Sequence, residues 1–162
     1  MAYSEFKASF QEMARPNRFE ITEAGLLSQP LLVKAASLPG SNIPPVEVFH
    51  EGLAVKLAGD RSYEDWDVTA YLNKEATLFA NIIQWRDLAV NTANVGSTNK
   101  EDYKFDLGVR MLNRDGSTID GTEFKLIGAF PSVVAPIDLD HSTNDTAGEF
   151  TITFSYDYYE NI

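Results

Sequence analysis

The feature that most constrains the fold is a period-two alternation of apolar and polar residues. In the closing stretch 149–160, Phe150, Ile152 and Phe154 alternate with Thr151 and Thr153. Successive side chains of a β-strand point to opposite faces, so this stretch is predicted to be a strand with one buried and one solvated face. The predicted buried face of this strand consists of Phe150, Ile152, Phe154, Tyr156 and Tyr158.

The same alternation recurs along most of the chain. Residues 63–72 place Trp66, Val68, Ala70 and Leu72 on one face. Two strands are predicted between Phe19 and Gly40, and two more pair through a turn at Asp115-Gly116. The predicted inward rows of that pair are Tyr103, Phe105, Leu107, Val109 and Met111 on one strand and Phe124, Leu126 and Phe130 on the other. We therefore predict a mainly β protein of two packed antiparallel sheets, a sandwich or barrel-like body.

Three segments depart from this pattern. Residues 74–90 repeat apolar side chains at helical spacing, which predicts one flanking α-helix with Asn73 as a candidate cap. Residues 40–62 begin with Pro44 and Pro45 and contain a Glu51-Gly52 turn signal, so we predict a long projecting hairpin or loop. Residues 1–15, ahead of Pro16, form a predicted N-terminal arm.

The length, net charge and lack of cysteine exclude several classes of function. The 162 residues suit a single domain, 1–162, with a formal net charge of -11 and no cysteine. A surplus of acid argues against binding nucleic-acid phosphates or an anionic membrane, and the lack of thiols excludes disulfides and cysteine-ligated metals. No signal peptide or membrane-spanning run is recognised, so we expect a protein made in a cytoplasm, with no cofactor and no membrane insertion signal.

The acidic stretch "AGDRSYEDWDVT" is the strongest candidate for chemistry. If residues 63–70 form a strand, Asp65 and Asp67 share a face. Two carboxylates in this position are compatible with a metal site, but a solvated strand face is the favoured interpretation. Neither His50 nor His141 accompanies a recognisable nucleophile motif. We therefore predict no catalytic, metal or cofactor-binding residue, and that the chain is not an enzyme.

Four stretches carry a resemblance to a known family. They are "ARPNRFEI", "ASLPG" followed by a proline-bearing segment, "AGDRSYEDWDVT", and "GAFPSVVAPIDLD" with "EFTITFSYDYYE". Their order and spacing resemble the tail tube proteins of contractile-tailed bacteriophages, the myovirus tube, over about residues 14–159. The resemblance implies a virion structural protein that self-assembles into stacked hexameric rings, the inner tail tube through which DNA is ejected.

The resemblance also implies partners and a place of assembly. They are other copies of the chain, the tail sheath, a baseplate tube initiator, a tape-measure protein and a tail terminator, with assembly in the host bacterial cytoplasm. DNA would pass through the lumen without specific binding, because an acidic lining repels its backbone. Two alternatives stay open: a tube subunit of a phage-like bacteriocin or contractile injection system, and a soluble β-sandwich ligand-binding module.

The predicted elements and the family resemblance together suggest roles for individual residues. Asp65 and Asp67 are predicted to face the lumen or a subunit junction, with Asp60 and Arg61 holding a turn where subunits meet. The remaining candidates are Pro44, Pro45, Glu51 and Lys56 for ring stacking, Thr77, Asn81 and Gln84 for an outer, sheath-facing side, and Trp66, Val68, Trp85 and Phe154 as core anchors.

Overall fold

The computed structural model describes residues 14–23, 33–90, 99–142 and 146–162. Most of the predicted N-terminal arm, residues 1–13, lies outside the described residues. The elements in chain order are β1 (Phe19–Glu23), β2 (Val33–Ala36), β3 (Ser41–Asn42), β4 (Pro45–His50), β5 (Leu53–Ala58), β6 (Ser62–Tyr63), β7 (Trp66–Tyr71), α2 (Thr77–Ala89), α3 (Lys100–Tyr103), β8 (Phe105–Met111), β9 (Phe124–Val134), β10 (Glu149–Ser155) and β11 (Tyr158–Asn161).

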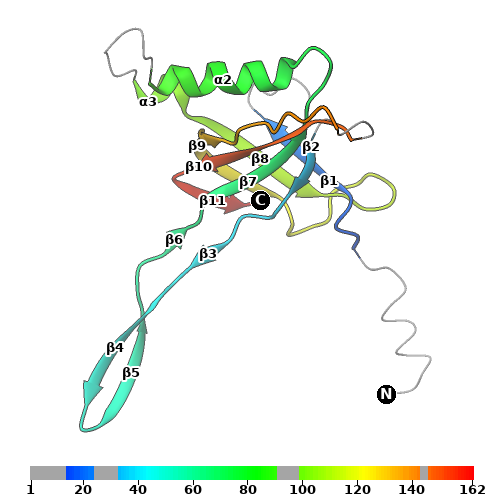
Figure 1. Ribbon diagram of the computed structural model, residues 1–162. Helices are drawn as coiled ribbons and strands as arrows, with labels where there is room; N and C mark the ends of the chain where they lie inside the picture. The colour runs from blue at the N-terminus through cyan, green and yellow to red at the C-terminus, as the bar shows by residue number, and fades with distance from the viewer. Residues whose placement is uncertain (1–13, 24–32, 91–98, 143–145) are drawn as a thin grey trace, which may run out of the picture.

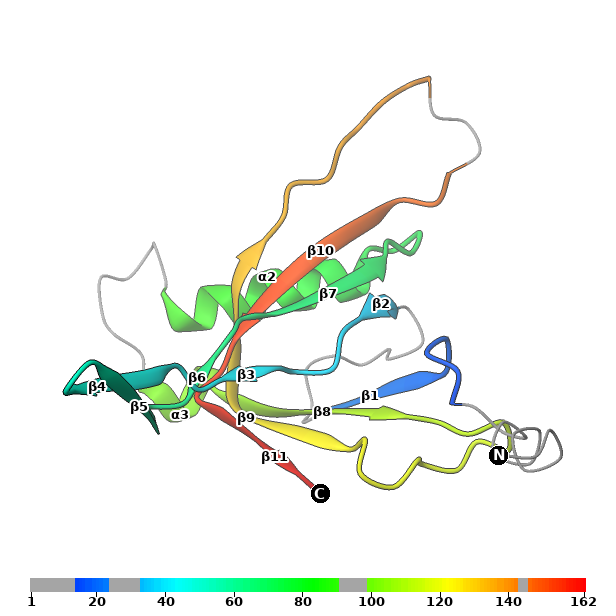
Figure 2. The same cartoon turned by 90° about the horizontal axis from the view of Figure 1, so that it is seen from below.

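Two antiparallel sheets share the long strand β9. Its first half pairs with β8 and β11, and β8 pairs with β1; we call this group sheet A. Its second half pairs with β10, which continues through β7 to β2; we call this group sheet B. The two sheets diverge from the end of the body where the hairpin begins (Figure 2). The predicted mainly β, two-sheet architecture with a flanking helix and a projecting hairpin is confirmed.

The bend in β9 comes from Gly128. Its φ of +67° is a left-handed conformation that favours glycine. The register between β8 and β9 also shifts here, so that three residues of β9 advance over two of β8. As a result Ala129 and Pro131 are buried, and Phe130, which simple alternation predicted to face inward with Leu126, is only half-buried beside Tyr103.

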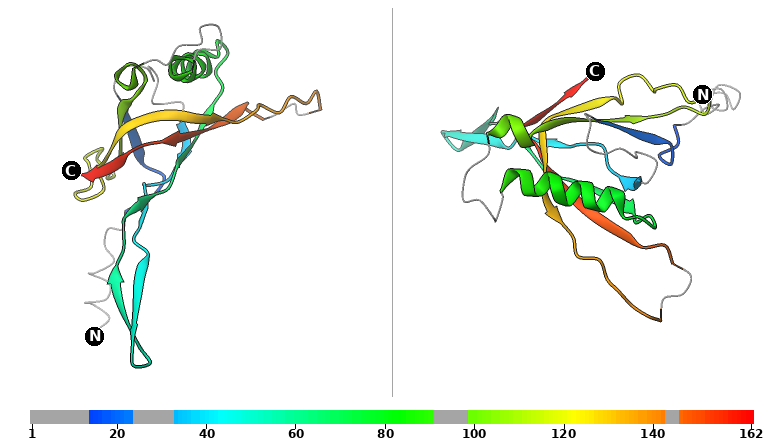
Figure 3. Two further views of the ribbon diagram at one scale, coloured as in Figure 1. Left: turned by 90° about the vertical axis from the view of Figure 1, so that its left-hand side faces the viewer. Right: turned by 90° about the horizontal axis from the view of Figure 1, so that it is seen from above.

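The core lies between the sheets and beneath α2. Phe154 of β10 contacts the ring of Trp66 on one side and that of Trp85 on the other, with centroids 5.8 and 5.6 Å apart. Both indole N–H groups are satisfied, since Trp66 donates to the Ser37 carbonyl and Trp85 to the Tyr103 carbonyl. Helix α2 lies across the sheets, as Figures 1 and 3 show. Its residues Leu78, Ile82 and Trp85 belong to the same buried apolar cluster as Phe150, Ile152 and Phe154 of β10.

Helix α2 begins later than predicted. The predicted start was Lys74, but Lys74 and Glu75 form a turn and Ala76 adopts a left-handed φ of +49°. The side-chain carbonyl of Asn73 accepts a hydrogen bond from the Thr77 backbone N–H at 3.0 Å. Asn73 therefore satisfies a free N–H of the first helical turn from four residues away.

Two aromatic residues occupy positions that alternation did not predict. Tyr103 was predicted to start the β8 strand but ends the short helix α3. The closing stretch breaks at Tyr156-Asp157 into β10 and β11, so Tyr158 is exposed and Tyr159 packs against the core instead. A break in a strand resets which residues face inward.

Candidate functional site

The outer side of sheet B presents a row of small polar side chains. Because Phe150, Ile152 and Phe154 of β10 point toward α2, their neighbours point away from the helix. Thr153 donates a hydrogen bond to Asp67 at 2.6 Å and Ser155 donates to Asp65 at 2.9 Å. The surface we call the carboxylate face consists of Asp65, Asp67, Thr69, Thr151, Thr153 and Ser155.

The carboxylates of the carboxylate face are not matched by cationic side chains in the described part of the chain. Asp65 and Asp67 are exposed, and their partners are neutral hydroxyls. Among the described residues neither carboxylate forms an ion pair within 4.0 Å. The hydroxyl donors hold the carboxylates against the sheet without neutralising them.

The outer side of sheet A is organised differently, through cross-strand ion pairs. Arg110 of β8 contacts Glu20 of β1 at 2.7 Å, and Lys125 of β9 contacts Asp106 of β8 at 2.9 Å. The hydrogen bond from Lys125 lowers the pKa of Asp106, and a second from the Gly128 N–H acts in the same direction. Glu20 and Asp106 on sheet A therefore have cationic partners, whereas Asp65 and Asp67 have none among the described residues.

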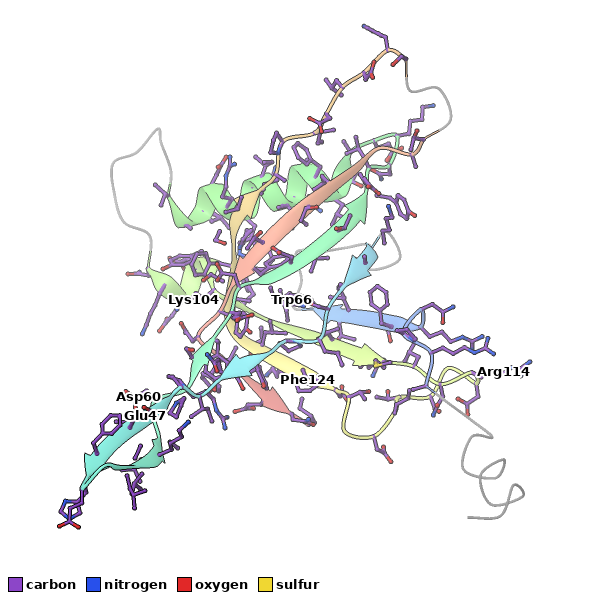
Figure 4. The ribbon with its side chains drawn as sticks, turned by 60° about the horizontal axis from the view of Figure 1, so that its bottom comes forward. Glu47, Asp60, Trp66, Lys104, Arg114 and Phe124 are labelled. Carbon is purple, nitrogen blue, oxygen red and sulfur yellow. The ribbon has the colours of Figure 1, made fainter. Side chains whose placement is uncertain are left out.

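Asp60 and Arg61 do not join the carboxylate face. They lie exposed in the connection between β5 and β6, where the hairpin leaves the body. In Figure 4 Asp60 lies beside Glu47 on the hairpin side, away from Trp66 in the body. The neighbouring Gly59 N–H donates to the Pro44 carbonyl at 2.9 Å, which closes the base of β4–β5.

The hairpin carries an exposed apolar row. Among the described strands β4 and β5 pair only with each other. The Glu51-Gly52 turn has φ values of +49° and +82°, as a two-residue type I′ connection requires. The register places His50 and five apolar side chains on one side, which we call the apolar hairpin face. Its apolar members, each 50–74% exposed, are Val46, Val48, Leu53, Val55 and Leu57.

The predicted ring-stacking residues all lie on the hairpin, but they do not belong to the apolar hairpin face. Pro44, Pro45, Glu51 and Lys56 are all exposed on the hairpin, and Lys56 pairs with Glu47 at 3.3 Å on the opposite side from the apolar row. Sequence reasoning did not select the apolar row itself. The pattern that could have identified it is the alternation in "VEVFHEGLAVKL", where both predicted strands carry apolar residues at every second position.

Aromatic side chains anchor the base of the hairpin to the body. The Tyr63 ring of β6 lies 5.3 Å from that of Tyr159 and 6.1 Å from that of Tyr156, measured between centroids. The Tyr159 hydroxyl donates to the Ser41 hydroxyl of β3 at 3.1 Å. Burial raises the pKa of Tyr156, whose hydroxyl has no hydrogen-bond partner among the described residues.

The predicted outer residues of α2 differ in exposure. Gln84 is exposed, whereas Asn81 is half-buried and Thr77 is half-buried and bonded to Asn73. The four predicted core anchors Trp66, Val68, Trp85 and Phe154 are 1–3% exposed. Val90, just beyond the last turn of α2, is 74% exposed.

Within the described ranges, no three His, Asp or Glu side chains gather as a metal site would require. His50 lies 3.9 Å from Glu51 at the exposed hairpin tip, and His141 is exposed in the loop before β10. No helix in the described part of the chain is long and apolar enough to cross a membrane.

Comparison with known proteins places this arrangement in a family. Residues 2–161 match the family model described as phage tail tube protein. The chain is 29% identical over 152 residues to "Tail tube protein gp19" of Enterobacteria phage T4, covering 92% of each chain.

Solved structures show the same fold at low sequence identity. A chain of the anti-feeding prophage baseplate aligns with a TM-score of 0.71 and 11% identity, covering 94% of this chain and 97% of that one. A chain of the sheath–tube complex of an extracellular contractile injection system aligns with a TM-score of 0.63 and 14% identity, covering 100% and 99%. Since the family model spans nearly the whole chain, the protein belongs to the phage tail tube protein family.

Proposed function

We propose that this chain assembles into stacked hexameric rings that form the inner tube of a contractile phage tail. The observation that carries the proposal is the apolar hairpin face, which stays half or more exposed while the core of the body is closed. A contiguous exposed apolar patch on a folded protein commonly marks a surface that binds another protein. A two-stranded hairpin is also marginally stable alone in water, so we expect it to be covered in the assembly.

The hairpin is the proposed contact between stacked rings. It projects beyond the body (Figure 1), so it can reach a neighbouring copy while the sheets remain intact. Docking of the row around Val48 and Val55 would remove apolar surface from water. Pro44 and Glu51 lie at the two ends of the hairpin, and Pro45 and Lys56 lie on its opposite side, where they could contact a further copy.

The test compares two matched substitutions of exposed valines. Val48→Asp puts a charge in the middle of the apolar hairpin face, whereas Val90→Asp puts one beyond α2. In negative-stain microscopy we expect Val48→Asp to permit rings and prevent long tubes, as removal of the hairpin tip should also do, and Val90→Asp to form tubes like the wild type. Normal tubes from folded Val48→Asp would contradict the proposed contact.

We further propose that the carboxylate face lines the lumen. It lies on the side of sheet B away from α2, which suits an arrangement with the helix outside, where Thr77, Asn81 and Gln84 would approach the sheath. Six copies at -11 give a formal charge of -66 per ring (6 × 11). Asp65 and Asp67, which have no cationic partner within 4.0 Å in the described part of the chain, would repel DNA phosphates and let the duplex slide.

A charge-reversal pair tests the lumen. Tubes of Asp65→Lys with Asp67→Lys are expected to retain short DNA duplexes at low salt and release them as salt rises, because lysine–phosphate contacts release counterions. Glu101→Lys with Asp102→Lys on α3 makes the same charge change elsewhere. Equal DNA retention by both variants would contradict the assignment of the lumen.

The remaining partners follow from a tube of this kind. We propose that a baseplate initiator starts the tube, a tape-measure protein sets its length and a terminator closes it, with the sheath around it. The virion tail is the proposed location and the host cytoplasm the proposed place of assembly. Phage particles whose tube gene carries Val48→Asp should lack full-length tails in electron micrographs.

A further inference from the structure

The hairpin joins the body through a narrow ribbon formed by β3 and β6. These strands pair over only two residues each. Beyond them the Gly59 N–H donates to the Pro44 carbonyl, and the β4–β5 ladder begins directly after this bond (Figure 1). Ribbon and hairpin are therefore one continuous two-stranded extension, and its direction is set where the ribbon meets the body.

The length of this extension makes its base important. From Ser41 to His50 the chain advances by about 30 Å, at roughly 3.3 Å per residue. A rotation of about 10° at the base would move the tip by about 5 Å, which is the spacing between neighbouring strands. A two-stranded ribbon is marginally stable alone, so side chains of the body must hold the base if the tip is to keep one direction.

Three tyrosines hold the base of the extension. The ring of Tyr63 on β6 packs edge-on against that of Tyr159 on β11 and also contacts that of Tyr156. Tyr159 in turn packs against Phe124 of β9, with centroids 5.4 Å apart, and its hydroxyl donates to Ser41 of β3. Tyr159 therefore contacts both strands of the ribbon and one strand of the body. We call Tyr63, Tyr156 and Tyr159 the tyrosine bracket.

The body fixes the position of the bracket through the break between β10 and β11. At this break the Asp157 N–H donates to the Ile127 carbonyl at 3.0 Å. The Lys104 ammonium contacts the Asp157 carboxylate at 2.7 Å, and the Lys104 side chain is only 23% exposed. From there β11 pairs with the first half of β9, which places Tyr159 opposite Leu126 of the core.

The geometry points to a positioning role for these residues. We propose that the tyrosine bracket fixes the direction of the hairpin in the free subunit, so that the apolar hairpin face meets a second copy already aligned. A segment that is ordered before docking loses less conformational entropy on association. This inference rests on the proposed function, because the hairpin needs a fixed direction only if it docks on another subunit.

The experiment measures the direction of the hairpin in free subunits of the full-length chain. The sequence has no cysteine, so Leu53→Cys near the hairpin tip and Gln84→Cys on α2, both exposed, can carry two spin labels. Pulsed electron paramagnetic resonance then gives the distribution of distances between tip and body. We expect one narrow distribution in the labelled parent and a broad one after Tyr63→Ala. Tyr63→Phe keeps the ring contacts and should keep the narrow distribution.

A matched truncation separates positioning from a general loss of stability. Tyr158→Ala removes the neighbouring, more exposed tyrosine of β11 and should leave the distances unchanged. If Tyr63→Ala does not fold by circular dichroism, Tyr63→Leu replaces it. A broad distribution in the parent, an equally narrow one in the folded Tyr63 variant, or equal broadening in Tyr158→Ala would overturn the tyrosine bracket.

The consequence for assembly is measured without labels. We expect the concentration at which tubes appear to rise about tenfold for Tyr63→Ala, roughly the loss of one weak contact, and to stay unchanged for Tyr63→Phe. An unchanged onset in Tyr63→Ala would also overturn the proposal. Failure of the proposed function is distinguishable, because it would leave the wild type without tubes, whereas the distance measurement on free subunits needs none.

Discussion

The β7 strand of the body and the β4–β5 hairpin share one sequence pattern and differ in what covers it. In β7, Trp66, Val68 and Ala70 alternate with polar residues and are 0–3% exposed. In the hairpin, Val46 and Val48 alternate in the same way and are 50–52% exposed. Alternation predicts which residues share a face, but the covering layer depends on the rest of the fold.

This difference separates stability from assembly. Apolar residues of the body contribute to folding of the single chain, because its own sheets and helix cover them. Apolar residues of the hairpin find no such cover among the described residues of the chain, and we propose that a second copy covers them. Paired substitutions, one in each region, test whether the two roles are in fact separate.

The largest difference in the free energy of unfolding is expected between alanine variants of two phenylalanines, one in the body and one in the hairpin. Phe154→Ala removes a ring packed between Trp66 and Trp85 and should lower the free energy of unfolding by about 3–5 kcal/mol. Phe49→Ala on the hairpin removes a ring that is 71% exposed and should change it by less than about 0.5 kcal/mol. Urea unfolding of freshly diluted subunits measures both, and similar losses would mean that the hairpin is part of the cooperative core.

The second comparison uses two glycines with positive φ. At Gly128 an added Cβ would lie 2.6 Å from an Asp157 carboxylate oxygen, whereas at Gly52 it would meet nothing within 4 Å. Gly128→Ala is therefore expected to destabilise the body by about 1–3 kcal/mol through backbone strain, with the clash adding to it. Gly52→Ala strains only the hairpin turn, so the midpoint of thermal unfolding should stay near that of the wild type.

The result would be contradicted by equal midpoints for the two alanine variants. Near-ultraviolet circular dichroism gives a second readout, because the bend at Gly128 positions Phe130 against Tyr103. We expect that aromatic signal to change in Gly128→Ala and to be preserved in Gly52→Ala.

These positions also show how far the sequence predicts the structure. Period-two alternation placed Trp66, Val68 and Phe154 correctly on inward faces because their strands are regular where they occur. It misassigned Phe130 and Tyr158, each of which follows a bulge or break that shifts the phase by one residue. A bulge depends on pairing with a distant strand, and no local residue pattern in this chain identified it.

For the two surface features, too, one part was predictable from the sequence and another part depends on the tertiary fold. That Asp65 and Asp67 share a side followed from their spacing alone, but their partners Thr153 and Ser155 lie about ninety residues away and depend on the register of β7 with β10. The apolar hairpin face could be read as a strand pattern, whereas its exposure is a property of the tertiary fold.

The smallest expected change in the free energy of unfolding comes from a comparison of two ion pairs. Asp106–Lys125 in the body and Glu47–Lys56 in the hairpin both join neighbouring antiparallel strands. Asp106→Asn in the body removes a carboxylate whose pKa is lowered, first by the hydrogen bond from Lys125 and then by that from the Gly128 N–H. Since the carboxylate is partly exposed, the loss at neutral pH should be only about 0.2–1 kcal/mol. Glu47→Gln in the hairpin removes the partner of Lys56 and should leave unfolding of the body unchanged.

The stability difference between the wild type and Asp106→Asn should depend on pH, and the lowered pKa of Asp106 fixes the direction of that dependence. A carboxylate whose folded pKa is depressed adds stability that is fully present above its unfolded pKa, about 3.9, and is lost as the pH falls through the folded pKa. The gap between wild type and Asp106→Asn should therefore stay constant from pH 7 to the unfolded pKa of about 3.9 and narrow as the pH falls further, while Glu47→Gln follows the wild type throughout. A gap that does not narrow below that pH would mean that Asp106 acts through packing at the Gly128 bend, so that the ion pairs of sheet A would not distinguish body from hairpin.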